Sequence, residues 1–277
     1  MSHPRIHPAY LSLLGLLGLP LAHGATDSAL EIPATRVSGT QAYTSYQPRE
    51  NQTAPKIDAP LRDIPQSVSA VPQSVIRDQG AQSMEDVLKN VPGVGLSNGD
   101  GQRDQVTLRG FSAIGDQFID GMRDDALYYR DLSNIERVEV LKGPAAVLYG
   151  RGSSGGLINS ISKKPRFEPA QEIGISLDSE GKKRTQFDAG WADSEQRDKA
   201  FRVTGALEDS DGFRDDAHLE RKALAASSFF ELSDDLSLNL GASYLYDKRL
   251  IDFGIPASDG RPVRVDRDTR FGSGDAD

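Results

Sequence analysis

The sequence predicts an α+β domain followed by the first strands of an antiparallel transmembrane β-barrel. Three observations predict this fold class. The run at 135–165 reads as strand, short helix, glycine-rich loop and strand. From residue 171 the chain changes to segments of about ten residues with alternating hydrophobicity, a pattern typical of membrane barrel strands. An apolar stretch at the N-terminus indicates export from the cytoplasm.

The N-terminus has the features of a signal peptide. Arg5 precedes an apolar run at 11–21, which is too short for a stable membrane anchor. Small residues suited to a signal peptidase follow, so cleavage is predicted after Gly24 and the signal peptide spans 1–24. A buried helix is the alternative, but two glycines and a proline in the apolar run argue against it. The absence of cysteine is compatible with export without requiring it.

Composition excludes several function classes. The net charge of −9 makes the chain a poor nucleic-acid binder. Only His218 lies beyond residue 23, which argues against a histidine-rich metal site. The G-x-G-x-x-G spacing at 150–155 follows a short helix and precedes a strand. In a dinucleotide site the order is the reverse, because the motif follows a strand and begins a helix. The S-x-x-K match at 160–163 lacks its companion motifs. We therefore predict no catalytic residue, no metal site, no cofactor and no enzyme activity.

The central run predicts two strands around a short helix. Apolar and charged residues alternate over 135–140, as in a half-buried strand. Pro144 suits the first position of a helix, where its missing N–H costs nothing. The helix is predicted at 145–149, with Gly150 as a left-handed cap, and the next strand at 157–162.

The preceding residues complete a compact unit. Ser83 begins a capping-box pattern that predicts a short helix at 84–90. Another strand is predicted at 106–111, and Asp120-Gly121 predicts the tight turn of a hairpin. We place the boundaries of this domain at 56–165.

The C-terminal half contains the predicted membrane strands. Five candidates follow one another: 172–178, 185–191, 200–208, 223–232 and 236–246. Phe187 and Trp191 share one face of the second, opposite Asp188; Leu207 opposes Arg202 in the third. An apolar outer face and a polar lumen face would produce this alternation. A soluble antiparallel sandwich with one solvated face is the alternative, which the pattern alone leaves open.

Five strands are too few to close a barrel around a domain. Plugged outer-membrane transporters have about 22 strands, and an open sheet in lipid would leave backbone groups unpaired. We therefore expect the chain to be the N-terminal part of a larger receptor, with an incomplete barrel at 166–277.

The run IERVEVLKGPAAVLYGRGSSGGLINSISKKP and the strand VTLRGF resemble the plug domain of TonB-dependent outer-membrane receptors. The segment LRDIPQSVSAVP at 61–72 resembles the first plug strand of this family. The resemblance implies a plug at 56–165 and a barrel that has 22 strands in the complete family. It also implies a Ton box within the polar, flexible linker predicted at 25–55, where EIPATRV resembles this motif. Its residues are Glu31, Ile32, Pro33, Ala34, Thr35, Arg36 and Val37. An extended peptide of this kind adds as a strand to the sheet edge of TonB.

The resemblance further implies where binding residues lie. Basic residues of the family's "RGF" and "RGP" elements latch the plug to acidic barrel residues; here they are Arg109 and Lys142, with partners expected beyond residue 277. Lysine departs from the family pattern because it lacks the bidentate guanidinium. Two apical loops, 97–104 and 123–131, are expected to face the ligand. The predicted contacts are Arg103, Arg123, Tyr128, Tyr129 and Arg130, which supply charged hydrogen bonds and stacking surfaces.

The implied function is TonB-dependent import of a ferric siderophore, with GMRDDALYYRDLSNIERVEVLKGP most similar to the catecholate subgroup. The implied partners are TonB with its energising proteins ExbB and ExbD, the siderophore and outer-membrane lipid. The implied location is the outer membrane of a Gram-negative bacterium, with plug and Ton box accessible from the periplasm. The alternatives are a haem, cobalamin, saccharide or other chelate receptor, a signalling receptor, a bare plug-like binding protein, and a truncated receptor fragment without function. The short span before the plug argues against a signalling domain there.

Overall fold

The structure is a computed structural model. It describes residues 46, 50–51, 53–54, 59–60, 63, 65–97, 101–143, 146–150, 155–179, 181–193, 197–233 and 235–272. The chain divides into two units, Met1–Ile32 and Pro33–Asp277, and all described residues lie in the second. The predicted signal peptide and Ton box lie outside the described residues. None of the helices in the described ranges is long and apolar enough to span a membrane.

A five-stranded mixed sheet forms the centre of the N-terminal domain. Its strands, in spatial order, are β3 (Ser67–Pro72), β9 (Ile135–Lys142), β10 (Gly156–Ser162), β7 (Gln117–Ile119) and β8 (Met122–Arg123). Strand β10 is antiparallel to β9 and parallel to β7. The two predicted strands around a short helix are confirmed, since α3 (Ala146–Tyr149) separates β9 from β10 and Gly150 adopts φ +70°. The first predicted strand is shorter than expected.

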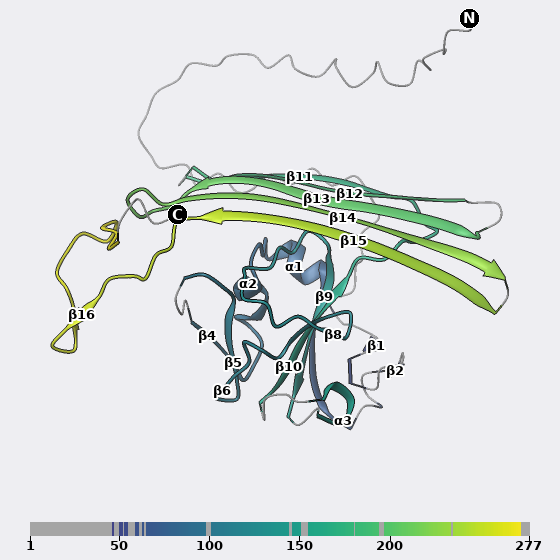
Figure 1. Cartoon of the computed structure of the whole chain (residues 1–277), viewed down its shortest axis with the longest axis horizontal. Helices are drawn as coiled ribbons and strands as arrows, with labels where there is room; N and C mark the ends of the chain where they lie inside the picture. Colours follow the sequence, from purple (N-terminus) through teal and green to yellow (C-terminus); the bar gives the residue numbers. More distant parts are fainter. Residues whose placement is uncertain are drawn as a thin grey trace, which may run out of the picture. The chain divides into compact units, whose positions relative to one another are not determined.

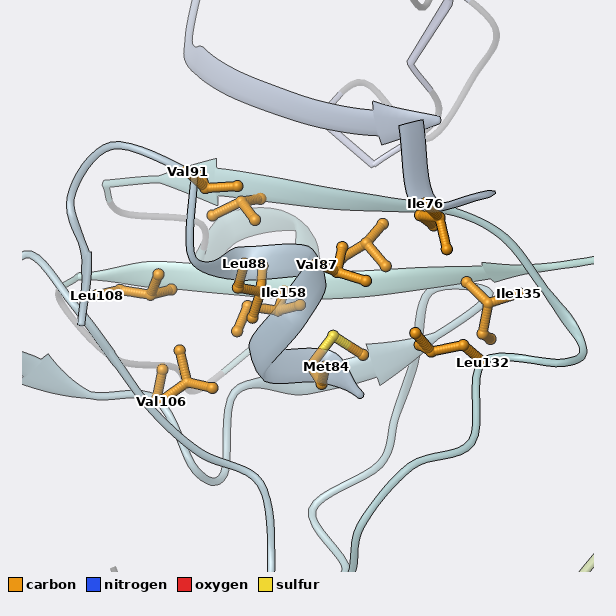
Figure 2. Close-up of a cluster of buried hydrophobic side chains, with 13 residues drawn as sticks. Ile76, Met84, Val87, Leu88, Val91, Val106, Leu108, Leu132, Ile135 and Ile158 are labelled. Carbon is orange, nitrogen blue, oxygen red and sulfur yellow. The ribbon is translucent and has the colours of Figure 1, made fainter. Parts of the chain in front are cut away.

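The core of this domain packs two helices against the sheet (Figure 2). Helix α1 (Gln73–Asp78) was not predicted, whereas α2 (Met84–Leu88) was. The capping box at the start of α2 is confirmed: the Asp86 amide donates to Ser83 Oγ at 3.1 Å, and the Ser83 amide donates to Asp86 Oδ2 at 3.2 Å. Met84, Val87 and Leu88 are buried in the cluster. A single apolar core therefore holds the helices on the sheet.

One tight turn was predicted from the sequence, and a second one interrupts a predicted strand. The hairpin at Asp120-Gly121 is confirmed, with φ values of +50° and +80° that suit a short turn. The predicted strand at 106–111 is instead broken by a turn at Arg109-Gly110, where φ is also positive. A separate three-stranded sheet results, made of β4 (Val94–Ser97), β5 (Gln105–Leu108) and β6 (Phe111–Ser112).

The C-terminal half forms a five-stranded antiparallel sheet (Figure 1). Its strands pair in chain order: β11 (Ala170–Leu177), β12 (Lys183–Ala192), β13 (Lys199–Asp211), β14 (His218–Ser233) and β15 (Leu236–Arg249). All five predicted strands are confirmed, and most extend by several residues beyond the predicted ends. Two two-residue pairs remain, β1 (Glu50–Asn51) with β2 (Ala59–Pro60) and β16 (Ala257–Ser258) with β17 (Arg261–Pro262).

The burial of this sheet is inverted relative to a soluble protein. On β13 the polar residues Arg202 and Glu208 are buried, at 4% and 6% exposure, whereas Leu207 is 60% exposed. Leu224 on β14 and Leu240 on β15 are exposed on the same face as Leu207, by the strand register. A soluble sandwich would bury this apolar face. The pattern instead matches a membrane barrel, with apolar side chains toward lipid and polar ones inward.

Aromatic residues mark one end of the apolar face. Trp191 stacks on Phe201 with ring centroids 6.0 Å apart, and Phe201 meets Phe230 edge to face at 5.6 Å. Barrel strands carry such aromatic girdles at the boundary between hydrocarbon and headgroups.

The orientation of the sheet predicts that substitutions on its two faces destabilise the protein to different extents. Leu224→Arg would place a charge on the apolar face and is expected to destabilise the membrane-embedded protein by about 2–4 kcal/mol. Ser243→Arg lies on the opposite face of the neighbouring strand and is expected to cost less. Urea unfolding of both variants in lipid vesicles checks this. Equal losses would contradict the assignment of the lipid face.

Candidate functional site

Arg130 is the centre of the apical loop that follows β8. The side chain is 5% exposed. Its Nε donates to Asp124 Oδ2 at 2.9 Å and its Nη2 donates to the Asp124 carbonyl at 2.7 Å. The Arg130 amide donates to Asp104 Oδ2, also at 2.9 Å. These bonds fasten the loop to Asp104, the last residue of the other predicted ligand loop. Arg130 thus uses its donors inside the site, and its predicted ligand contact stays a prediction.

Tyr128 belongs to the same internal network. Its hydroxyl donates to Asp124 Oδ2 at 2.7 Å, and the Arg130 guanidinium lies 4.6 Å from the centre of its ring. Burial, followed by the hydrogen bond to Asp124, raises the pKa of Tyr128 well above its ordinary value. The phenol therefore remains protonated at physiological pH and acts as a donor within the loop.

Tyr129 faces a different environment, the end of the five-stranded sheet. The Arg249 guanidinium at the end of β15 lies 3.8 Å from the centre of its ring. A hollow of about 290 Å³ opens beside this pair, lined by Gly101, Tyr129, Asp211, His218, Arg249 and Asp252, among others. A planar cation over an aromatic ring offers a stacking surface for an aromatic guest. The charge of Arg249 is partly offset, because it pairs with Asp247 at 2.6 Å and because the carboxylates of Asp211 and Asp252 line the hollow. Sequence reasoning identified Tyr129 but missed Arg249 and His218.

The two remaining predicted ligand contacts do not line this hollow. Arg123 forms an ion pair with Asp116 at 3.6 Å and covers the Phe118 ring at 4.8 Å. Arg103 is half-buried in the loop that precedes Asp104. Both roles stay predictions.

A buried ion cluster joins the N-terminal domain to the sheet near this loop. Asp131 accepts from Arg184 of β12 at 2.9 Å and pairs with Arg221 of β14 at 3.6 Å. Arg184 also bonds Glu208 of β13 at 2.7 Å. The side chains of Asp131 and Arg184 are 5% and 2% exposed. Each charge has an opposite partner, as buried ions require.

A second buried cluster lies further along the same strands. Lys163 pairs with Asp188 of β12 at 2.9 Å, and Asp188 pairs with Arg202 of β13 at 2.7 Å. Arg202 also pairs with Glu136 at 3.6 Å. Burial lowers the pKa of Lys163 and raises that of Glu136, so both shifts reflect desolvation that the opposite charges only partly offset. Together, the two clusters hold the domain to the inward face of β12, β13 and β14.

The predicted latch residues make other contacts. Lys142 donates to Ser69 Oγ at 2.9 Å within the domain, and burial lowers its pKa. The backbone of Arg109 donates to the Gly93 carbonyl at 2.8 Å, in the left-handed turn already described. No ion pair of either residue occurs within the described ranges, so their latch role stays a prediction. The ion pairs to the sheet described above come from Asp131, Glu136 and Lys163, which the sequence does not distinguish from surface charges.

The stability contributed by Asp131 is expected to depend on pH. Burial alone would raise its pKa, but Arg184 and donors from Ser133 hold the pKa below the ordinary value of 3.8. The folded state therefore binds the proton less tightly, so this stability is complete above about pH 4 and is lost as pH falls through the lowered pKa. The difference in free energy of unfolding between the unaltered protein and Asp131→Asn should shrink in acid. A constant difference across this range would contradict the prediction.

The part of the chain that the structure describes contains no group of three or more metal-ligating side chains. The stacked ring and charged side chains surround the hollow beside Tyr129. The two buried ion clusters bind the N-terminal domain to the five-stranded sheet. Such a site can hold a guest by noncovalent contacts.

The comparisons with known proteins agree on one family. Residues 60–157 match the TonB-dependent Receptor Plug Domain. A probable TonB-dependent receptor of Bordetella pertussis, BfrD, is 34% identical over 90% of this chain and 34% of its own length. The catecholate siderophore receptor Fiu of Escherichia coli K12 is 34% identical over 84% of this chain and 31% of its own. The metal-pseudopaline receptor CntO of Pseudomonas aeruginosa PAO1 is 33% identical over 92% of this chain and 37% of its own length.

The solved structure of Fiu in a closed form superposes with a TM-score of 0.71, covering 76% of this chain and 30% of the receptor. The chain spans about a third of the length of these relatives. The similarity accounts for both parts of the fold, a plug domain followed by barrel strands.

Proposed function

Because this chain belongs to the TonB-dependent receptors, we propose that it carries the plug and first barrel strands of a receptor that imports a ferric siderophore. The membrane concerned is the outer membrane of a Gram-negative bacterium, with the plug reached from the periplasm. The observation that carries the proposal is the inverted sheet: its apolar face is exposed, and buried ion clusters bind its polar face to the plug. A plugged barrel needs both features.

The proposed mechanism is mechanical. The siderophore binds beside the apical loops, and TonB, energised by ExbB and ExbD, engages the Ton box at 31–37 and pulls. The plug then shifts against the wall, and the contacts of Asp131 and Glu136 with the strands must loosen or rearrange. Iron is the cargo of this transport. The relatives are receptors, and the described side chains are proposed to do no covalent chemistry.

A catecholate complex is the favoured substrate class. Such complexes are anionic and aromatic, and Tyr129 with Arg249 offers a stacking surface beside the hollow, together with a guanidinium that is also paired with Asp247. The similarity to Fiu supports the same class. The similarity to CntO favours a second candidate, a metal–pseudopaline type of complex. Haem, cobalamin and saccharides remain as further alternatives.

The domain boundaries and site residues belong to the same proposal. The plug is proposed to span 56–165, which contains the range matched by the family model. Ligand contacts are proposed for Tyr129, Arg103 and Arg123, with Tyr128 and Arg130 shaping the loop. Arg249 is added to the ligand contacts because it stacks on Tyr129.

The stacking of Arg249 on Tyr129 predicts that a substitution of Arg249 weakens siderophore binding. Arg249→Lys keeps the charge but loses the flat guanidinium that covers Tyr129, so ligand affinity should fall roughly tenfold. Arg197→Lys is the matched control, because Arg197 stacks over Phe167 at 5.1 Å but does not line the hollow. Equal affinities for the two variants would contradict the proposed contact.

Outer-membrane preparations test the substrate class. Membranes that contain the receptor are incubated with radioactive iron in a catecholate complex, a hydroxamate complex, a pseudopaline-like chelate or haem, and retained label is counted. Retention of the catecholate above membranes without the receptor supports the favoured class. Retention of another complex alone would replace it, and retention of none would contradict the import proposal.

A further inference from the structure

Thr53 is bound to the plug through all of its backbone and side-chain polar groups. Its amide donates to Glu139 Oε2 at 3.0 Å, and its hydroxyl donates to the same oxygen. The hydroxyl also accepts from Asn159 Nδ2 at 2.9 Å, and the carbonyl accepts from the Tyr149 hydroxyl at 2.7 Å. Thr53 is 0% exposed, although it lies in the segment predicted to be a flexible linker. Its contacts are those of an anchor.

The residue after this anchor adds apolar contacts. Ala54 is buried with Phe118, Leu141 and Leu157 in a small cluster separate from the main core. Tyr149 packs against it, with its ring edge to face with Phe118 at 4.9 Å. Burial, and then the charge of Glu139, raises the pKa of Tyr149 to about 12, so its hydroxyl remains a donor at physiological pH.

Glu139 makes this anchor unusual, because its carboxylate lies in the middle of the plug sheet. It is 0% exposed, on β9 between Ala70 of β3 and Asn159 of β10. Its other oxygen pairs with Arg137. Thr53 supplies two of the donors that the structure gives this carboxylate, and a buried carboxylate that loses its donors is strongly destabilised. The sheet therefore depends on Thr53 remaining in place.

We propose that Thr53 and Glu139 are positioning residues that hold the N-terminal segment on the plug until traction withdraws it. Pulling on the chain before residue 53 first breaks the exposed hydrogen bond of Tyr46 to Asp78 and the two-residue pair β1–β2, and then extracts Thr53. Extraction leaves the Glu139 charge without two of its donors between β3 and β10, which weakens the plug sheet from within. The inference rests on the proposed function, because the traction is that of TonB on residues 31–37. That motif ends 16 residues before the anchor (53 minus 37), or at most about 55 Å of extended chain.

Pulling on single receptors tests this directly. The chain has no cysteine, so Ser28→Cys provides a unique handle before the anchor. The receptor is embedded in a lipid bilayer and pulled from this handle. The first strong rupture is expected after about 90 Å of slack, the extended length of the 25 residues from 28 to 53, and follows only the weak release of Tyr46 and of β1. A first strong rupture at about 140 Å, where β3 begins at Ser67, would overturn the proposal.

Matched variants identify the anchor residue. Thr53→Ala loses a hydroxyl that bonds a buried charge, so the force of the rupture at about 90 Å should fall, and spontaneous exchange of the Ala54 amide should rise at least about tenfold. Thr53→Ser should restore both values. Thr107→Ala is the control. This substitution also removes a threonine hydroxyl with a hydrogen bond inside the plug, in this case to the Gly95 carbonyl at 3.3 Å. If Thr53→Ala and Thr107→Ala behave alike, the proposal fails.

The two proposals can fail independently. The first rupture needs neither TonB nor a siderophore, so the anchor can be disproved while import stands. If the receptor binds and imports no iron chelate, the import proposal fails whatever the rupture shows.

Discussion

Asp131→Ala is expected to destabilise the docked plug by about 3 kcal/mol. The substitution removes a carboxylate that is 5% exposed and leaves the buried Arg184 and Arg221 with one partner fewer. Breaking a buried pair from one side costs about 3–5 kcal/mol, because the remaining charge stays desolvated. The lower end applies here, since Arg184 keeps Glu208 and Arg221 keeps Asp247. Urea unfolding of the plug in the membrane-embedded receptor measures the loss.

An ion pair on the outer face of the same sheet provides the control. Lys222 pairs with Glu220 at 2.6 Å; Lys222 is exposed and Glu220 is half-buried. Lys222→Gln should change plug stability little, because Lys222 lies opposite Leu207 on the face turned away from the plug. A loss for Lys222→Gln equal to that for Asp131→Ala would show that the buried cluster does not hold the plug.

Ile32→Pro is expected to abolish uptake while leaving siderophore binding intact. The residue lies in the predicted Ton box, and proline removes an amide donor and an apolar side chain from a peptide that must add as a strand to TonB. Uptake should fall to the level of cells that lack TonB. Radioactive iron uptake, with binding measured in the same cells, checks both parts.

The control places the same change outside the motif. Gln41→Pro lies four residues after Val37, still within the predicted linker, and should leave uptake near normal. If both variants lose uptake equally, the segment at 31–37 is not the TonB contact. Loss of binding by Ile32→Pro would mean that the substitution acts on the ligand site instead.

Local patterns in the sequence predicted much of the fold. The turn at Asp120-Gly121 and the capping box at Ser83 depend on residues a few positions apart, so their chemistry is visible in the sequence. The five long strands show alternation over many residues. The break at Arg109-Gly110 was missed because an arginine with positive φ has no clear local pattern. Helix α1 is too short to show a helical period.

The site was less predictable, because it depends on pairing across the fold. Tyr128, Tyr129 and Arg130 are adjacent in the sequence, yet only Tyr129 lines the hollow and meets Arg249. The Asp131–Arg184 contact joins residues 53 positions apart. The charges on the inward faces of β12 and β13 were visible in the alternation, but their partners in the plug were not. Ion pairs between residues so far apart in the sequence are visible only in the folded structure.

Uptake of a radioactive ferric catecholate by iron-starved cells tests the central claim most directly. Three strains are compared: one with the receptor, one without it, and one with the receptor but without TonB. Accumulation in the first strain alone is the predicted result, with surface binding retained in the third. Equal accumulation with and without the receptor, or undiminished accumulation without TonB, would contradict it.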